Sequence, residues 1–111
     1  MTEQARKYLS DILVAIDRIE FFMTGIETFE QYQADIKTQS AVERQLGIIG
    51  EAASQYRKIE GANQLNHAQQ IAGFRNRIIH AYDNMDQTVI WAILKNHLSP
   101  LGNQVSDLLL A

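Results

Sequence analysis

Cysteine is absent from this chain of 111 residues, and proline occurs only once. Without cysteine the protein can form no disulfide, no thiolate metal site and no cysteine nucleophile, so its fold must depend on packing. Only six glycines accompany the single proline. Long segments are therefore free of the residues that most often interrupt secondary structure, which favours long helices.

Long apolar runs are also lacking, and none approaches the length needed to cross a bilayer. The first segment carries Asp11, Asp17 and Arg18 among its apolar residues, unlike the unbroken core of a signal peptide. Positive charge is not in excess, because 13 acidic and 10 basic residues give a net charge of −3. Any contact with nucleic acid must then come from a local basic cluster. We expect one cytoplasmic domain over residues 1–111, since this length has room for a single core.

Apolar residues recur at intervals of three and four along most of the chain, which is the spacing of an amphipathic helix. These stripes predict a helix over about residues 3–23 and a second long helix over about residues 38–59. The stripe residues are Leu9, Ile12, Ile16, Ile19 and Met23 in the first helix, and Val42, Leu46, Ile49, Ala53 and Tyr56 in the second. Gly47 and Gly50 lie inside the second helix, which indicates the close approach of another helix or of a ligand, and helix packing is the simpler explanation.

Two further helices are predicted from shorter patterns. Thr28 and Gln31 have the spacing of a capping box and predict a short helix over residues 29–35. A later helix is expected over about residues 68–82, after a polar connection. Its inner face would carry Ile71, Phe74, Ile78 and Ala81.

The last part of the chain predicts two more helical segments. Asp86 is a candidate N-cap for the first of them, and Ser99 followed by Pro100 resembles an N-cap with proline at the first helical position of the second. The apolar stripe here consists of Val89, Ile90, Ile93, Leu94 and Leu98. Because the connections are short, we predict an all-α, up-and-down bundle of four or five helices.

Residues useful for catalysis gather in the helix predicted over residues 68–82. On a helical wheel, Arg75 and Tyr82 lie at the edge of the apolar stripe, whereas Asn76 and His80 lie four residues apart on the opposite side. Ile79 falls between these two polar pairs. An isoleucine outside the core and among polar side chains indicates a covered face, such as a shallow cleft or a dimer seam.

These residue types match the needs of a ribonuclease that works without a metal. An arginine can hold a phosphate through two hydrogen bonds, a histidine can transfer protons near neutral pH, and a tyrosine offers a hydroxyl. Cleavage also needs both a base and an acid, and one chain supplies a single histidine at this place. We therefore predict a homodimer in which two copies of this helix meet, so that Arg75 and His80 of both chains contribute.

The sequence resembles the HepT branch of the HEPN superfamily. The family pattern R-N-x-x-x-H, which extends to R-x-x-x-x-H-x-Y, is matched by Arg75, Asn76, His80 and Tyr82. The resemblance covers nearly the whole chain and includes YLSDIL at residues 8–13, IIGEA at 48–52, IAGF at 71–74 and Trp91. The chain departs from the family at residues 66–68, where it has Asn-His-Ala in place of a segment that contains tryptophan.

The resemblance implies that the protein is a dimeric HEPN-type bundle and the toxin of a type VII toxin–antitoxin system, acting on RNA as a metal-independent endoribonuclease. Arg75 and His80 would be catalytic, with Asn76 in support. The partner would be a minimal nucleotidyltransferase antitoxin that adenylylates the Tyr82 hydroxyl. A bulky anionic adenylate near the cleft would repel an RNA phosphate and block access, so modification would silence the toxin. No cofactor is implied.

Two readings from other classes compete with the ribonuclease. A non-catalytic subunit could present Tyr82 to a nucleotidyltransferase without cutting RNA, and the acidic net charge favours this reading. The local basic cluster that we can assemble consists of Arg57, Lys58, Arg75 and Arg77. A purely structural helical adaptor would explain the apolar stripes, but it gives no reason for Ile79 to lie among polar residues.

His67 and His97 were considered with His80 as possible metal ligands. His67 and His97 join His80 in the chain, but they show neither a paired spacing of four residues nor a companion carboxylate. We therefore predict no metal and expect solvated or capping roles for His67 and His97.

Three other side chains, Glu51, Tyr56 and Trp91, were considered as members of the site. Glu51 follows Gly50 and could orient Arg75, although a glutamate on a long helix is more often a solvated charge. Tyr56 and Trp91 are interpreted as packed core aromatics without a role in the site.

Overall fold

The computed structural model describes residues 1–61, 65, 67–68, 71 and 87–111. Its helices are α1 (Glu3–Phe22), α2 (Phe29–Gln33), α3 (Ile36–Glu60), α5 (Gln87–Asn96) and α6 (Leu98–Leu110). The described ranges contain no strand, so the predicted all-α fold is confirmed. Most of the helix predicted over residues 68–82 lies outside the described residues, as does the candidate cap Asp86.

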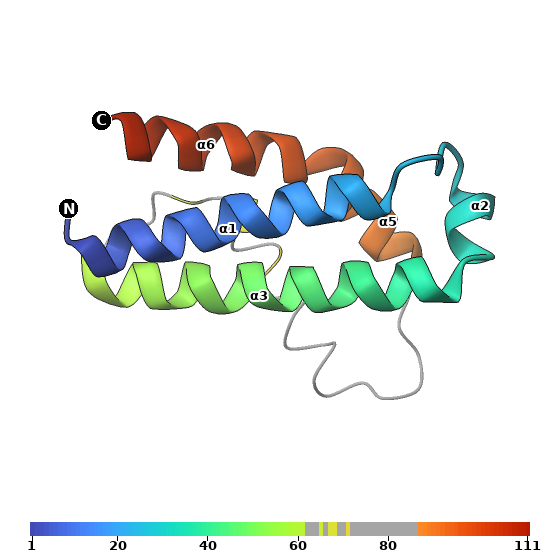
Figure 1. Ribbon diagram of the computed structural model, residues 1–111, viewed down its shortest axis with the longest axis horizontal. Coiled ribbons are helices and arrows are strands. Elements are labelled where there is room, and N and C mark those ends of the chain that lie inside the picture. Colours follow the sequence, from blue (N-terminus) through green and yellow to red (C-terminus); the bar gives the residue numbers. More distant parts are fainter. Residues whose placement is uncertain (62–64, 66, 69–70, 72–86) are drawn as a thin grey trace.

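The two longest helices, α1 and α3, run antiparallel and side by side, and α6 packs along another side of α1 (Figure 1). The shorter α5 contacts both α2 and α6 at the opposite end of the bundle from the termini. The first and last helices are also joined by a hydrogen bond of 3.3 Å from Arg6 Nη1 to the Leu109 carbonyl oxygen. Of the helices described, none is both long and apolar enough to span a membrane.

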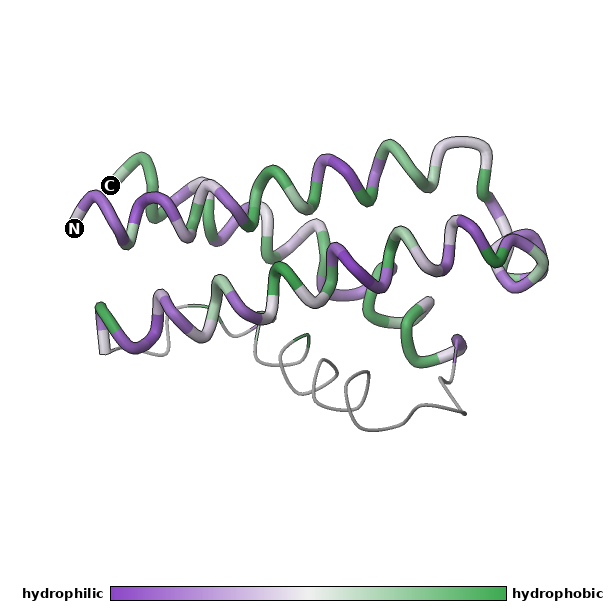
Figure 2. Tube along the Cα trace, turned by 60° about the horizontal axis from the view of Figure 1, so that its bottom comes forward, coloured by the Kyte–Doolittle hydropathy of each residue, from purple (hydrophilic) through white to green (hydrophobic). Residues whose placement is uncertain are grey.

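The predicted apolar stripes form the core. In α1 the residues Leu9, Ile12, Ile16 and Ile19 are buried, and Met23 packs partly against them. All five residues of the α3 stripe are buried. Figure 2 shows the hydrophobic positions recurring along both helices between hydrophilic ones. The interpretation of Gly47 was wrong: a Cβ atom there would meet no described atom within 4 Å.

Local hydrogen bonds explain where α2 and α3 begin. The capping box is confirmed, because Thr28 Oγ1 accepts from the Gln31 backbone N–H and Gln31 Oε1 accepts from the Thr28 N–H, both at 3.2 Å. Asp35 then caps α3 by accepting from the Thr38 backbone N–H at 3.0 Å and from the Thr38 hydroxyl at 2.7 Å. This cap makes α2 two residues shorter than predicted and starts α3 at Ile36, two residues earlier.

The cap at Asp35 predicts a pH-dependent stability. The hydrogen bonds from the Thr38 backbone and side chain lower the pKa of the Asp35 carboxyl below its usual value. A lowered folded-state pKa means that the carboxylate stabilises the protein above the unfolded pKa of about 3.9, and this contribution is lost as the pH falls through the lowered value. We expect Asp35→Ala to unfold at a lower urea concentration than the wild type at pH 7, and the difference should shrink below about pH 4.

Asp17→Ala, at an exposed position of α1, is the matched control for this experiment. Its stability should stay within about 0.5 kcal/mol of the wild type at pH 7. A difference between wild type and Asp35→Ala that stays constant from neutral to acidic pH would show that the cap contributes nothing through its charge.

The predicted start of the last helix was wrong. The helix α6 begins at Leu98, with His97 as its N-cap, and not after Ser99. His97 both ends α5 and begins α6, because its N–H donates to the Ile93 carbonyl at 2.9 Å and its own carbonyl accepts from Leu101 at 3.0 Å. The buried Leu98 thus joins the core within the helix, and Pro100 is tolerated in the first turn, where the N–H needs no helical partner.

Candidate functional site

Arg75, Asn76, His80 and Tyr82 all lie outside the described residues, so their geometry stays a prediction. The structure describes the residues on both sides of this segment, which we call its framework. Residues 65, 67–68 and 71 precede the segment, and α5 follows it. The following contacts show how that framework is fixed to the bundle.

On the N-terminal side, the chain enters the segment from the core. Leu65, Ala68 and Ile71 are 6%, 2% and 0% exposed, at intervals of three residues. The Ala68 N–H donates to the Leu65 carbonyl at 3.1 Å. Ile71 therefore occupies the inner position predicted for it, and the other predicted inner residues of this helix lie outside the described part.

On the C-terminal side, the first residue of α5 is tied to α3. Gln87 Nε2 donates to Glu43 Oε1 at 2.9 Å, between residues that are both partly buried. Three residues later, Ile90 is completely buried. The chain thus leaves the motif segment at a point held by both a polar contact and an apolar contact.

A pair of histidines connects the N-terminal side of the segment to the junction of α5 and α6. The Nδ1 atoms of His67 and His97 are 2.9 Å apart, and the ring centroids are 5.1 Å apart. One nitrogen must carry the hydrogen and the other must accept it. The expectation of solvated roles was wrong, because both residues are partly buried. His97 does occupy the N-cap position of α6, but its side chain makes no capping hydrogen bond.

Metal ligands are not gathered in the part of the chain that the structure describes. Within it, no group of three or more histidine, aspartate or glutamate side chains has the geometry to hold a metal ion. His67 and His97 are paired with each other, and His80 lies outside the described residues.

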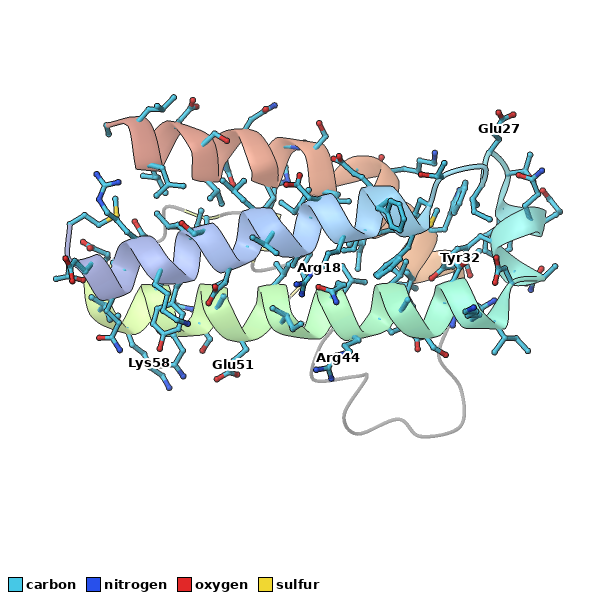
Figure 3. All side chains as sticks on the ribbon, in the orientation of Figure 1. Arg18, Glu27, Tyr32, Arg44, Glu51 and Lys58 are labelled. Carbon is cyan, nitrogen blue, oxygen red and sulfur yellow. The ribbon has the colours of Figure 1, made fainter. Side chains whose placement is uncertain are left out.

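Glu51 lies on the exposed face of α3, on the side turned away from α1, where Figure 3 also places Lys58. One of its carboxylate oxygens accepts a hydrogen bond of 3.0 Å from Gln55 Nε2, one helical turn later. Arg57 is exposed in the last turn of α3, beside Lys58. A role of Glu51 in orienting Arg75 stays a prediction, as does the extension of the basic cluster to Arg75 and Arg77.

Aromatic packing fixes α5, which follows the motif segment, against α2. The ring centroid of Trp91 is 6.0 Å from that of Phe29 and 5.8 Å from that of Tyr32. Tyr32 is completely buried, and this burial raises the pKa of its hydroxyl far above the usual value, with a further contribution from Glu43. Trp91 is partly buried and packs against the core, while Tyr56 is buried as predicted.

The sequence analysis missed the two contacts that join distant parts of the framework. Glu43 and Gln87 are 44 residues apart, and His67 and His97 are 30 residues apart. Neither pair has a motif or a spacing that would reveal it in the sequence. Both pairs flank the segment that carries the predicted site.

Comparison with known proteins identifies the family. Residues 12–108 match the family described as "Ribonuclease HepT-like". The chain belongs to this family. The match covers the whole of the motif segment and all the framework contacts described above.

Two relatives illustrate how far the family likeness extends. A protein of Thermococcus cleftensis named "Probable ribonuclease HepT" is 36% identical over 112 residues, which cover 97% of this chain and 98% of the relative. A protein of Methanocaldococcus jannaschii, named as a candidate RNase, is 34% identical over 100 residues, covering 85% of this chain and 78% of the relative. No solved structure shows a significant match to the chain.

Proposed function

We propose that this chain is a metal-independent endoribonuclease with Arg75, Asn76 and His80 as its catalytic residues. The observation that carries the proposal is the motif R-N-x-x-x-H-x-Y, from Arg75 to Tyr82, within a chain of the HepT-like family. A relative of nearly the same length is named as a ribonuclease, which supports the same activity. We further propose that residues 1–111 form one domain and that two copies form the working dimer.

The proposed reaction divides the work between two subunits. His80 of one chain takes the proton from a ribose 2′-hydroxyl, and the freed oxygen attacks the adjacent phosphorus. Arg75 holds the phosphate and stabilises the negative charge that develops there. His80 of the partner subunit gives a proton to the leaving 5′-oxygen, so a bond from the 2′-oxygen to phosphorus forms as the bond to the 5′-oxygen breaks.

Preorganisation supports this assignment. Positioned groups contribute to catalysis only if their framework holds them in place. The described residues on either side of the motif segment are anchored to the bundle, because Ile71 is completely buried and Gln87 donates a hydrogen bond to Glu43. In this proposal Glu51, on α3, supports Arg75.

We also propose that the protein is the toxin of a toxin–antitoxin pair. A minimal nucleotidyltransferase would transfer AMP from ATP to the Tyr82 hydroxyl, releasing pyrophosphate. The added phosphate carries negative charge and the nucleoside adds bulk, so the product would repel and obstruct the RNA. Modification at Tyr82 would therefore act on the site through charge and access.

One experiment tests both parts of the proposal. The purified protein is incubated with RNA in a metal chelator, before and after treatment with ATP and a minimal nucleotidyltransferase of the proposed kind. We expect cleavage in chelator before treatment, and its loss after treatment together with a mass increase of one adenylate per modified tyrosine. Tyr82→Phe should cut RNA but resist both the modification and the silencing.

Tyr8→Phe provides the matched control, because Tyr8 is partly buried on α1 and far from the motif in the sequence. This variant should be modified and silenced like the wild type. Absence of cleavage by the untreated protein would overturn the ribonuclease, and a modified Tyr82→Phe would overturn the assignment of the tyrosine.

The second candidate function is a non-catalytic subunit that binds a nucleotidyltransferase. The net charge of −3 favours it, because an acidic protein attracts RNA less strongly. The same experiment separates the two functions: this candidate is modified at Tyr82 but never cuts RNA.

A further inference from the structure

A groove that contains a buried, unpaired amide oxygen lies between α1 and α3. It has a volume of about 180 Å³, and its lining residues are Asp11, Val14, Ala15, Arg18, Gln45 and Ile48. Gln45 is only 6% exposed, and its Oε1 atom has no hydrogen-bond partner. A buried amide oxygen without a donor is costly, so a ligand that brings an N–H group into the groove would relieve that cost.

The two ends of this groove carry opposite charges. Asp11 and Arg18 are seven residues apart on α1, which separates them by about 10 Å along the helix axis. Lys7 Nζ contacts Asp11 Oδ2 at 2.9 Å, in an exposed and therefore weak ion pair. Among the described residues, none forms a hydrogen bond or an ion pair with Arg18. Figure 3 shows the Arg18 side chain directed toward the space between α1 and α3, so a guanidinium is available to a ligand there.

The walls between the two charged ends are apolar. Val14, Ala15 and Ile48 line the groove beside its polar residues. Val14 is 47% exposed, although it is large and apolar. The volume of about 180 Å³ lies below the range of about 300–1,000 Å³ that is usual for drug-sized ligands. The groove therefore suits a single small ring system with apolar faces, flanked by polar groups.

A nucleotide combines these features. Its phosphate is an anion that the Arg18 guanidinium can hold through two hydrogen bonds. Its base has apolar faces, and the N–H groups at the edge of the base can donate to Gln45 Oε1 and to the Asp11 carboxylate. The sugar separates the anionic end from the donating end, as the groove requires. A free amino acid also carries both charges, but on one carbon atom, so it cannot reach Asp11 and Arg18 together.

We propose that the groove between α1 and α3 is a nucleotide-binding subsite, in which Arg18 holds the phosphate and Gln45 accepts a hydrogen bond from the base. An RNA chain and a free mononucleotide share this chemistry, and the experiment distinguishes the two sources. Where the source is RNA, the subsite deepens the proposed function and rests on it, because it would hold a nucleotide of the substrate outside the motif from Arg75 to Tyr82.

Binding of the four mononucleotides AMP, GMP, CMP and UMP, each followed by two-dimensional amide NMR in a metal chelator, tests the subsite. With at least one of them, we expect the signals of residues 11–18 and 45–48 to shift together. Arg18→Gln removes the cation and should weaken the binding at least about tenfold. Arg44→Gln is the matched control, because Figure 3 places Arg44 on the side of α3 turned away from α1. It should bind like the wild type.

Gln45→Met separates a binding role from a structural one. The substitution keeps an unbranched side chain of similar length and removes the amide, so the affinity for the mononucleotide should fall about threefold to tenfold. The urea midpoint should not fall, because the variant no longer buries an unpaired oxygen. A Gln45→Met protein with a lower midpoint and an unchanged affinity would show a structural role and overturn the assignment of Gln45.

A short 2′-O-methyl RNA, which has no free 2′-hydroxyl to start cleavage, distinguishes the two sources. Displacement of the mononucleotide would support an RNA chain as the ligand, and a mononucleotide that stays bound would support a free nucleotide. Absence of mononucleotide binding, shifts confined to other parts of the protein, or wild-type affinity in Arg18→Gln would each overturn the subsite. RNA cleavage measured on the same samples keeps the two proposals apart: a protein that binds nucleotides here but never cuts RNA contradicts only the proposed ribonuclease.

Discussion

Replacing His80 with alanine is expected to slow RNA cleavage by about 10²–10⁴-fold, because the variant loses its general base and general acid. Replacing Arg75 with alanine is expected to cost about 10²–10³-fold, since the developing charge on the phosphate loses its cation. Single-turnover cleavage of a labelled RNA with excess protein measures both effects on the chemical step. The rate at saturating protein separates them from weaker RNA binding.

Arg44→Ala is the control for the loss of an arginine. Arg44 is exposed on α3, and Figure 3 places it on the side of α3 that is turned away from α1. This variant should cleave RNA at close to the wild-type rate. Dimer content and helicity are measured for every variant, so that a loss of rate is not mistaken for a loss of assembly. Wild-type rates in both His80→Ala and Arg75→Ala would remove these residues from the mechanism.

Leu46→Ala is expected to reduce the free energy of unfolding by about 2–5 kcal/mol. Leu46 is 0% exposed in the middle of α3, within the core that α3 shares with α1. The substitution removes buried apolar atoms and leaves a cavity that the surrounding helices fill only in part. Urea unfolding followed by circular dichroism gives the change through the shift in midpoint.

The neighbouring Arg44→Ala variant also controls this measurement, because it truncates a long side chain on the exposed side of the same helix. Its change should be within about 0.5 kcal/mol. A Leu46→Ala protein as stable as Arg44→Ala would mean that the contact between α1 and α3 is not the main source of stability.

The long helices were predictable because each has an uninterrupted apolar stripe that agrees with the core. Their ends were less so, since several residues near each end had the chemistry of a cap. Asp35 was not distinguished as the cap of α3, and it extended that helix beyond the predicted start. At α6 the pattern of Ser99 and Pro100 predicted a helix that begins after Ser99. The helix begins at Leu98 because this residue is buried in the core.

The sequence predicts which residues form the site, but it does not predict the contacts around the site. The prediction of Arg75, Asn76, His80 and Tyr82 as site residues rests on their order and spacing together with the resemblance to the HepT branch. The contacts of Gln87 with Glu43 and of His67 with His97 depend on how distant helices pack. No periodicity encodes such pairs, because the sequence specifies each helix face separately and their juxtaposition follows from the assembled bundle.

The last helix has a consequence for how the protein is made. α1 is packed along one side by α6, and the hydrogen bond from Arg6 to Leu109 joins residues 103 positions apart. On the ribosome, α1 and α3 can meet early, but this side of α1 stays open until α6 has been synthesised. A protein proposed to destroy RNA would thus complete this side of its bundle only after the segment that carries Arg75 and His80 has already been made.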